Sequence, residues 1–317
     1  TEFYIIVFII CILCLQFSKK ENTKYNFKQN AMYFVPFIFI FSFGIYKKYD
    51  NESISLYQER TFFGLNKVSE SNFINNDINY NIKKLTHGTT LHGAQIIKPK
   101  SLSNQTLTYY SKDNPIYLSI KDYDDFYNFK NIGIIGLGTG AMNCMFENKN
   151  VDFFEIDQEI INIAKNQFTY LNICQNRQNF LLGDARIKMK EINNNKYDII
   201  VVDAFSSDAI PVHLITKEAI SMYREKLKEN GLLVFHISNR YLNLEPVLGN
   251  IAKEINIQSK FCHKKQNKEQ IYSTGSQVVI MSDNMDFINN NCWNYTKIDN
   301  NNTWNDNYSN ILKYMIF

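Results

Sequence analysis

Residues 131–157 carry the pattern that most constrains the fold: an apolar strand, a glycine-rich turn, a helix, and a second strand that ends in an acid. Apolar residues bounded by glycines, as in Ile132–Ile135, are typical of a buried parallel strand. The glycines of the turn let the backbone reverse sharply and approach a ligand closely. They are Gly136, Gly138 and Gly140. The pattern predicts a nucleotide site at the end of a parallel sheet.

The acid of the second strand indicates what kind of nucleotide binds. Glu155 lies seventeen residues beyond Gly138, close to the spacing at which an acidic side chain accepts hydrogen bonds from ribose hydroxyls. The Gly-x-Gly-x-Gly spacing is one residue tighter than the dinucleotide fingerprint. We therefore predict an adenosine-containing cofactor of the S-adenosylmethionine type rather than NAD.

Composition excludes some classes of partner. The formal net charge is only +3 over 317 residues, and no lysine or arginine stripe is interleaved with aromatic residues, so we expect no nucleic-acid partner. The six cysteines are scattered. The only close pair, Cys11 and Cys14, lies in an apolar run without a nearby histidine. We expect reduced cysteines and no metal.

The first fifty residues are strongly apolar. FYIIVFIICILCLQF and the run Ala31–Tyr46 are each slightly shorter than the roughly 20 residues of a membrane-spanning helix. The basic start and small-residue cleavage site of a signal peptide are absent. We predict that residues 1–50 contain two transmembrane helices, and because residue 1 is not methionine, we expect further chain before it.

Two groups of lysines give opposite orientations in the membrane. Lys19, Lys20, Lys24 and Lys28 favour a cytosolic loop between the two apolar runs, whereas Lys47 and Lys48 favour a cytosolic location for the chain that follows. The lysine pattern leaves this conflict open. Our expectation is a membrane protein whose catalytic domain is cytoplasmic.

Residues 51–128 change character and predict a small β domain, because short apolar segments are broken by Gly, Asn and Pro. Within it, LTHGTTLHGAQ contains the pairs His87-Gly88 and His92-Gly93. These histidines are candidates for metal ligands, for a hairpin turn beside a ligand cleft, or for a purely structural turn. Tyr109 and Tyr110 are either strand aromatics or a wall for a cationic ligand.

Strand and helix patterns alternate through residues 129–317, as a doubly wound, mostly parallel α/β sheet requires. Three strands end in acids, at Glu155, Asp184 and Asp203. Because ligands of such sheets bind at the carboxyl ends of the strands, these acids should converge in one crevice with the glycine turn. Each acid, taken singly, could instead cap the helix that follows it. For the three acids together we favour a ligand-binding site.

A family resemblance extends over most of residues 59–310. Its motifs are ERTFFG, LTHGTTLHGAQ, GLGTG, FFEID, GDAR, VVDAFSSDAIPVHLITKEA, FHISNRYLNLEPVL and WNDNYSN. Together they resemble the bacterial spermidine-synthase-like proteins, in which a polyamine aminopropyltransferase domain follows membrane helices. The resemblance implies a small β domain, a methyltransferase-like Rossmann domain, and transfer of an aminopropyl group from decarboxylated S-adenosylmethionine to putrescine.

The resemblance also assigns roles to residues. It implies that Glu155 holds the ribose, Asp184 and Ala185 hold the adenine, and Gln95 lines the cleft. Asp203 falls at the position of the general base, and an acid is reasonable there because an ammonium acceptor must lose a proton before it attacks carbon. Asp208 is the alternative acid. The segment Phe205–Pro211 is a candidate lid.

Departures from the family pattern leave the substrate open. Thr139 replaces the family's aspartate, which meets the free amine of the decarboxylated donor, and a neutral hydroxyl better tolerates the carboxylate of intact S-adenosylmethionine. The acceptor cluster of the family is not reproduced after Gln95, where IIKPK follows. The alternatives are methyl transfer from S-adenosylmethionine and a non-catalytic cofactor sensor. A homodimer is also possible.

Overall fold

The computed structural model describes residues 54–75, 78–205, 211–267, 271–299 and 302–316. The chain divides into two compact units, Thr1–Glu52 and Ser53–Phe317, and all of the described residues belong to the second. The membrane segments predicted in residues 1–50 lie outside the described residues. Among the residues that are described, no helix has the length and apolar character needed to cross a membrane.

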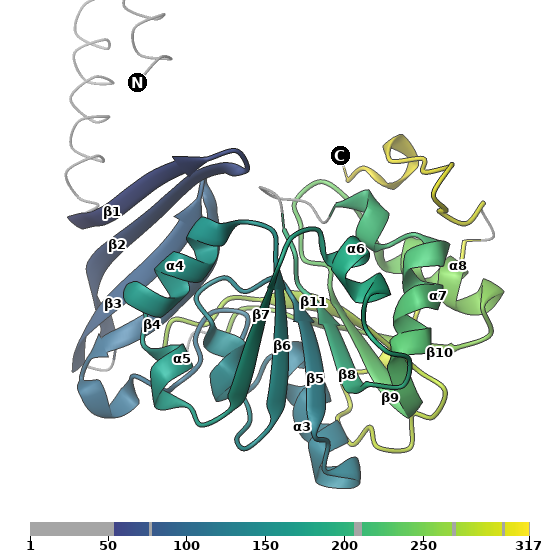
Figure 1. The fold of residues 1–317 in the computed structure, drawn as a ribbon, viewed down its shortest axis with the longest axis horizontal. Coiled ribbons are helices and arrows are strands. Elements are labelled where there is room, and N and C mark those ends of the chain that lie inside the picture. Colours follow the sequence, from purple (N-terminus) through teal and green to yellow (C-terminus); the bar gives the residue numbers. More distant parts are fainter. Residues whose placement is uncertain (1–53, 76–77, 206–210, 268–270, 300–301, 317) are drawn as a thin grey trace, which may run out of the picture. The chain divides into compact units, whose positions relative to one another are not determined.

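A twisted eight-stranded sheet forms the centre of the second unit (Figure 1). Its strand order is β12-β10-β11-β9-β8-β5-β6-β7; the run from β9 to β7 is parallel, and β11, β10 and β12 extend it with antiparallel pairing. The bounds are β5 (Asn131–Ile135), β6 (Asn150–Glu155), β7 (Arg177–Leu182), β8 (Tyr197–Val202), β9 (Leu227–His236), β10 (Gln258–Lys264), β11 (Ser276–Ser282) and β12 (Asn294–Tyr295). The predicted doubly wound, mostly parallel sheet is confirmed.

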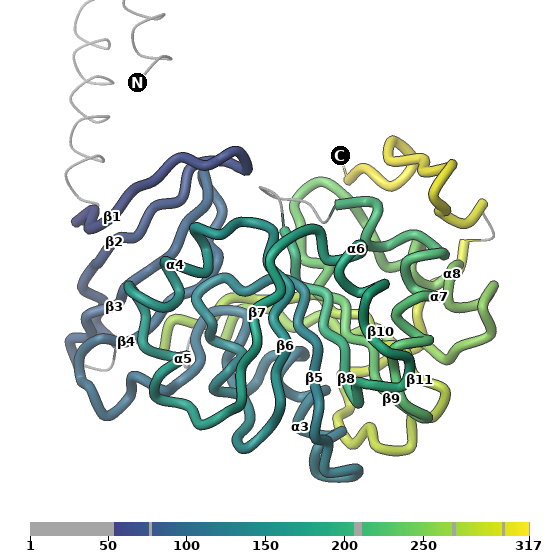
Figure 2. Tube along the Cα trace, in the orientation of Figure 1, coloured from purple at the N-terminus to yellow at the C-terminus, as the bar shows by residue number. Residues whose placement is uncertain are grey.

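Helices pack on both faces of this sheet (Figure 2). Successive side chains of a strand point to opposite faces, so Ile199 and Val201 of β8 join one core, whereas Ile200 and Val202 join the other. The first core contains side chains of α3 (Pro115–Tyr127), α4 (Gln158–Asn166) and α5 (Tyr170–Ile173), and the second contains side chains of α6 (Ala185–Lys190), α7 (Lys217–Lys226) and α8 (Glu245–Glu254). Because both faces are covered, the central strands are mostly apolar, and their polar residues lie at or near the strand ends or, like Asp152, bond to neighbouring polar side chains.

A smaller antiparallel sheet lies beside α4 (Figure 1). Its strands follow one another as β1 (Ile54–Thr61), β2 (Gly64–Asn75), β3 (Ile78–His87) and β4 (Thr90–Lys98). The turn between β3 and β4 is formed by Gly88, whose φ of 59° places it in the left-handed region. Val68 and Leu85 pack against Ile163 and Phe168. The small antiparallel sheet that we predicted is therefore present, and it shares a core with α4.

Three local predictions differ from the structure. The chain between the glycine turn and β6 forms only the 3₁₀ turn η2 (Ala141–Cys144), since few residues separate Gly140 from Asn150. Residues 106–110, in which Tyr109 and Tyr110 were considered as strand aromatics, form only an isolated bridge at Thr108. Residues 115–127, which we included in the β domain, form helix α3, whose apolar residues pack into the core of the larger sheet.

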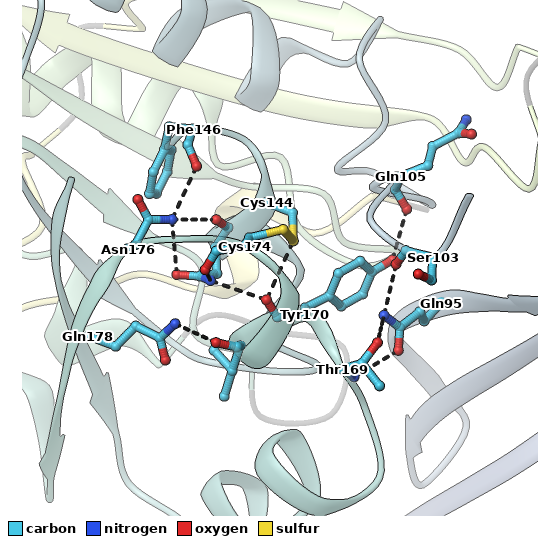
Figure 3. The surroundings of a disulfide bond; sticks show 12 residues. Gln95, Ser103, Gln105, Cys144, Phe146, Thr169, Tyr170, Cys174, Asn176 and Gln178 are labelled. Atoms are coloured by element: carbon cyan, nitrogen blue, oxygen red, sulfur yellow. Dashed lines mark hydrogen bonds between the residues drawn. A yellow bond between two sulfur atoms is a disulfide. The ribbon is translucent and has the colours of Figure 1, made fainter. Parts of the chain in front are cut away.

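The four cysteines in the described part of the chain were wrongly expected to be reduced. Disulfides join Cys144 to Cys174 and Cys262 to Cys292, with Cα–Cα distances of 5.3 Å in both pairs. Figure 3 shows the first bond, which connects η2 to the end of α5. Each pair is separated by 30 residues, so local spacing gave no sign of the pairing and only the tertiary fold brings the partners together.

We predict that the double variant Cys262→Ser/Cys292→Ser unfolds more easily, because it loses a cross-link that restricts the unfolded chain. For a loop of this length the loss is about 3–4 kcal/mol of unfolding free energy. Urea denaturation of the full chain without reductant should show a lower midpoint for the variant. In dithiothreitol the difference should disappear; equal midpoints without reductant would contradict the prediction.

Candidate active site

A cavity opens at the carboxyl ends of β5, β6, β7 and β8, and residues of the small sheet complete its wall. This is the crevice in which ligands of open α/β sheets bind. Eight of the residues that we singled out line it: Gly136, Gly138, Glu155, Asp184, Ala185, Asp203, Tyr109 and Tyr110. The expected convergence of the glycine turn with three strand-end acids is therefore present in the structure.

The glycine turn is shaped by its contact with the neighbouring strand end. Gly136 has a φ of 98°, and a Cβ atom at this position would lie 2.3 Å from the backbone oxygen of Asp203. Gly138 has a φ of 55°, and its Cβ would lie 2.8 Å from the backbone oxygen of His92. A side chain at either residue would push the turn away from its neighbours. The sequence thus needs glycine here for the cavity to keep its shape.

Glu155 is a buried acceptor at the end of β6. Its carboxylate accepts hydrogen bonds from three backbone N–H groups, those of Leu137 at 3.0 Å, Ile156 at 2.8 Å and Asp157 at 3.0 Å. Burial raises the pKa of Glu155, while the three N–H groups oppose that rise by stabilising the charged form. The side chain therefore fixes the glycine turn relative to β6 and also faces the cavity.

Asp184 has two partners at the end of β7. One carboxylate oxygen caps α6 by accepting from Ile187 N–H at 3.0 Å, and the other lies 3.0 Å from Nε2 of His213. The capping alternative that we considered for single acids is thus observed here. Asp184 caps the helix and also lines the cavity.

Asp203 lies in a buried polar cluster at the end of β8. Its Oδ2 accepts from the hydroxyl of Tyr110, and its Oδ1 lies 2.6 Å from Nδ1 of His236. Burial, together with the nearby charge of Asp203, raises the pKa of Tyr110 well above its usual value, so this hydroxyl stays protonated and donates. The ring of Tyr109 packs against the rings of Tyr110 and His236, with centroid distances of 4.3 Å and 4.6 Å.

Three of the predicted site residues do not line this cavity. Thr139 is fully buried, and its side chain packs against Gly93. Gly140 packs against Leu171. Gln95 is held in a structural network, in which it donates to Ser103 O and Thr169 Oγ1 and accepts from Thr169 N–H (Figure 3).

Part of the candidate lid Phe205–Pro211 falls outside the described residues, together with Asp208. The role that we assigned to Asp208 as the alternative acid therefore stays a prediction. Phe205 and Pro211, the two ends of the segment, line the cavity.

Sequence analysis missed several residues of this site. His236 ends β9, and the rule that ligands lie at strand ends, applied to the strand after Asp203, would have identified it. Asn66 and His213 line the cavity but carry no local signal in the sequence. The side chain of Asn66 donates to Asp157, while its own Oδ1 is buried without a partner.

The two histidines of LTHGTTLHGAQ both line the cavity, with their rings edge to face at 5.6 Å. They accompany a hairpin turn beside the cleft, which is one of the three interpretations that the sequence left open. Within the described part of the chain, no group of three or more His, Cys, Asp or Glu side chains is placed to hold a metal ion.

The cavity is strongly acidic. Its wall contains the carboxylates of Glu155, Asp157, Asp184 and Asp203, and among its described residues there is no lysine or arginine. Opposite charge within a few ångströms stabilises a bound cation, and a bound anion would lack a charged partner. The fold and the site define a methyltransferase-like α/β domain with an acidic cavity at the carboxyl ends of its parallel strands.

Comparison with known proteins identifies the family. Residues 120–294 match the spermine/spermidine synthase domain, so the chain belongs to this family. A polyamine aminopropyltransferase of Vibrio vulnificus is 35% identical over 107 residues, which are 32% of this chain and 35% of that protein. A polyamine aminopropyltransferase of Alkaliphilus oremlandii is 27% identical over 176 residues, which are 52% of this chain and 62% of that protein. The chain thus covers less than two thirds of the length of either relative.

The solved structures agree with the fold. A probable spermidine synthase from Corynebacterium glutamicum superposes with a TM-score of 0.56 at 13% identity, covering 73% of this chain and 80% of that one. At this level of identity the likeness supports the arrangement of the small antiparallel sheet and the α/β sheet.

Proposed function

We propose that this domain is an aminopropyltransferase that moves the aminopropyl group of decarboxylated S-adenosylmethionine to an amine of a polyamine. The observation that carries the proposal is the acidic cavity, in which the glycine turn and three strand-end carboxylates meet and the described wall has no basic residue. Both proposed substrates are cations. Family membership and the names of the relatives support the same activity.

The residues of the cavity fit an adenosine-containing substrate. The glycine turn offers close backbone approach, and Glu155 keeps a carboxylate at the ribose position implied by the family resemblance. We assign the adenine to the neighbourhood of Asp184 and Ala185. The sulfonium of the donor supplies an electrophilic carbon and a neutral thioether leaving group.

Asp203 is placed to prepare the acceptor amine. Its carboxylate attracts the ammonium form and takes one proton, which frees the nitrogen lone pair. The nitrogen then forms a bond to the aminopropyl carbon while the carbon–sulfur bond breaks, and methylthioadenosine leaves. The rigid wall formed by Tyr109 and Tyr110 supports Asp203. Most of the acceleration would come from positioning the two substrates.

Thr139 supported methyl transfer when only the sequence was considered. In the structure its side chain packs on Gly93, outside the cavity wall, and an acidic cavity offers no charged partner to the carboxylate of intact S-adenosylmethionine. Both observations favour the decarboxylated donor. Methyl transfer is therefore our second candidate, and it rests on the neutral turn residue alone.

The full chain, incubated with decarboxylated S-adenosylmethionine and putrescine, should release methylthioadenosine and form spermidine in equal amounts. The same protein with intact S-adenosylmethionine and an amine mixture should form no S-adenosylhomocysteine. Formation of S-adenosylhomocysteine would instead establish methyl transfer. Binding of the donor without any product, across a panel of di- and triamines, would favour the sensor function and refute aminopropyl transfer.

We propose that the chain is attached to a membrane through residues 1–50 and that the catalytic domain faces the cytoplasm. The apolar runs support attachment. The two disulfides oppose the cytoplasmic side, because such bonds are rare in the cytosol. Alkylation of acid-quenched cells should modify all four of these cysteines if the domain is cytoplasmic. Recovery of these cysteines as disulfides would refute a cytoplasmic location of the domain.

The homodimer stays a prediction that light scattering can test.

A further inference from the structure

His236 is a buried residue that the proposed reaction does not yet use. It ends β9, is 3% exposed, and is not part of the cavity wall. Its Nδ1 lies 2.6 Å from Oδ1 of Asp203, and its Nε2 lies 2.9 Å from Oγ of Ser238. The imidazole thus connects the proposed general base to a serine on the far side of the ring.

The contacts of His236 indicate which of its nitrogens carries the ring proton. Ser238 Oγ accepts a hydrogen bond from the backbone N–H of Gln277 at 2.7 Å. A hydroxyl has one proton to donate, and with Gln277 already donating to the oxygen, that proton can point at Nε2. Nδ1 then bears the ring proton and donates to Asp203. In the other neutral tautomer, a nitrogen lone pair would face a carboxylate across 2.6 Å, which is repulsive.

Asp203 is consequently held at both oxygens. His236 donates to Oδ1 and Tyr110 donates to Oδ2. The ring of Tyr109 packs against His236 and Tyr110 and limits their movement, and the ring of Phe205 packs against His236 at 5.0 Å. Each carboxylate oxygen keeps a lone pair for the substrate. The plane of the carboxylate is therefore set before any amine enters.

We propose that His236 is a positioning residue for Asp203, to which it donates from Nδ1 while the Ser238 hydroxyl can donate to Nε2. The inference rests on the proposed function for the identity of the amine that Asp203 receives. A carboxylate free to rotate would spend less time aligned with the amine, and misplacement of a reacting group by about 1 Å can cost on the order of 10²-fold in rate. The effect should appear in kcat.

Two substitutions at His236 separate positioning from simple packing. Asparagine keeps an N–H donor near the place of Nδ1, whereas leucine fills space without a donor. His236→Leu should lower kcat about 10²-fold, with little change in the KM of the donor, and His236→Asn should recover much of the loss. Equal kcat losses in the two folded variants, or a loss seen only in the donor KM, would overturn the proposal.

A spectroscopic measurement tests the geometry without any turnover. Nitrogen-15 chemical shifts of labelled histidines in the full chain should show that Nδ1 of His236 carries a proton, and Ser238→Ala should leave that proton in place, because Asp203 still accepts it. A wild-type Nε2–H tautomer would overturn the inference. If wild-type protein forms no product, the proposed function has failed, while the tautomer measurement still decides whether His236 holds Asp203.

Discussion

Replacing Asp203 with asparagine is expected to lower kcat for methylthioadenosine release by about 10²–10⁴-fold, the range that a positioned general base contributes. Asparagine cannot accept the proton of the ammonium substrate. Its amide group would also face one of two donors, the Tyr110 hydroxyl or the His236 ring, because both donate to the carboxylate in the native protein. The measurement is initial-rate kinetics at saturating decarboxylated donor and putrescine.

The clash of donors adds a cost in stability, since a buried donor without an acceptor costs about 1–3 kcal/mol. Rates should therefore be measured below the melting temperature of the variant. Asp198→Asn is a matched control: Asp198 lies on the same strand, β8, but accepts from the backbone N–H groups of Lys130 and Asn131 and does not line the cavity. Its kcat should be close to wild type. An Asp203→Asn protein with wild-type kcat would remove Asp203 from the mechanism.

Replacing Glu155 with glutamine is expected to weaken the binding of methylthioadenosine by about 10- to 100-fold, equivalent to about 1.4–2.8 kcal/mol at a factor of ten per 1.4 kcal/mol. The carboxylate accepts hydrogen bonds from three backbone N–H groups. Leu137 donates to Oε2, and Ile156 and Asp157 donate to Oε1. Glutamine offers a single carbonyl oxygen, so at least one buried N–H loses its acceptor. The glycine turn then loses its anchor to β6.

Isothermal calorimetry on the folded variant measures this loss. Glu159→Gln is the control, because Glu159 lies four residues further on, accepts from the Tyr57 hydroxyl, and does not line the cavity. Its affinity should match wild type. An unchanged dissociation constant for Glu155→Gln would contradict the assignment of the ribose site.

The raised pKa of Glu155 gives this site a direction of pH dependence. Burial favours the protonated form, so the carboxyl takes up its proton at a higher pH than an ordinary glutamic acid. A protonated Glu155 presents a donor where the turn needs an acceptor. Affinity for methylthioadenosine should therefore be complete above the raised pKa and fall as pH decreases through it. In Glu155→Gln this pH dependence should be absent.

Local sequence was sufficient to locate the strand-end acids of the cavity. Each of the residues involved follows a strand whose apolar run is visible in the chain, and the carboxyl ends of parallel strands share one edge of the sheet. Glu155, Asp184 and Asp203 therefore met in the cavity as expected. The same logic extended to β9 would have found His236.

Side-chain direction was not available from the sequence. Thr139 belongs to the glycine turn, yet its side chain packs on Gly93 of β4, because the small sheet lies against this side of the turn. Gln95 was expected in the cleft, but three hydrogen bonds hold it to residues near η1 (Lys100–Leu102) and α5. Both outcomes depend on how the two sheets approach each other, which no local pattern encodes.

By itself, the sequence determined the α/β class, the order of the parallel strands along the chain, and the acids at their ends. These features follow from apolar periodicity and from the conformational freedom of glycine, and both are properties of short segments. The tertiary structure alone decided the pairing of cysteines 30 residues apart, the cluster of Tyr110, Asp203 and His236, and the placing of histidines from the small sheet on the cavity wall. Such contacts join residues far apart in the chain, so they form only when the core packs and fixes one arrangement of its side chains.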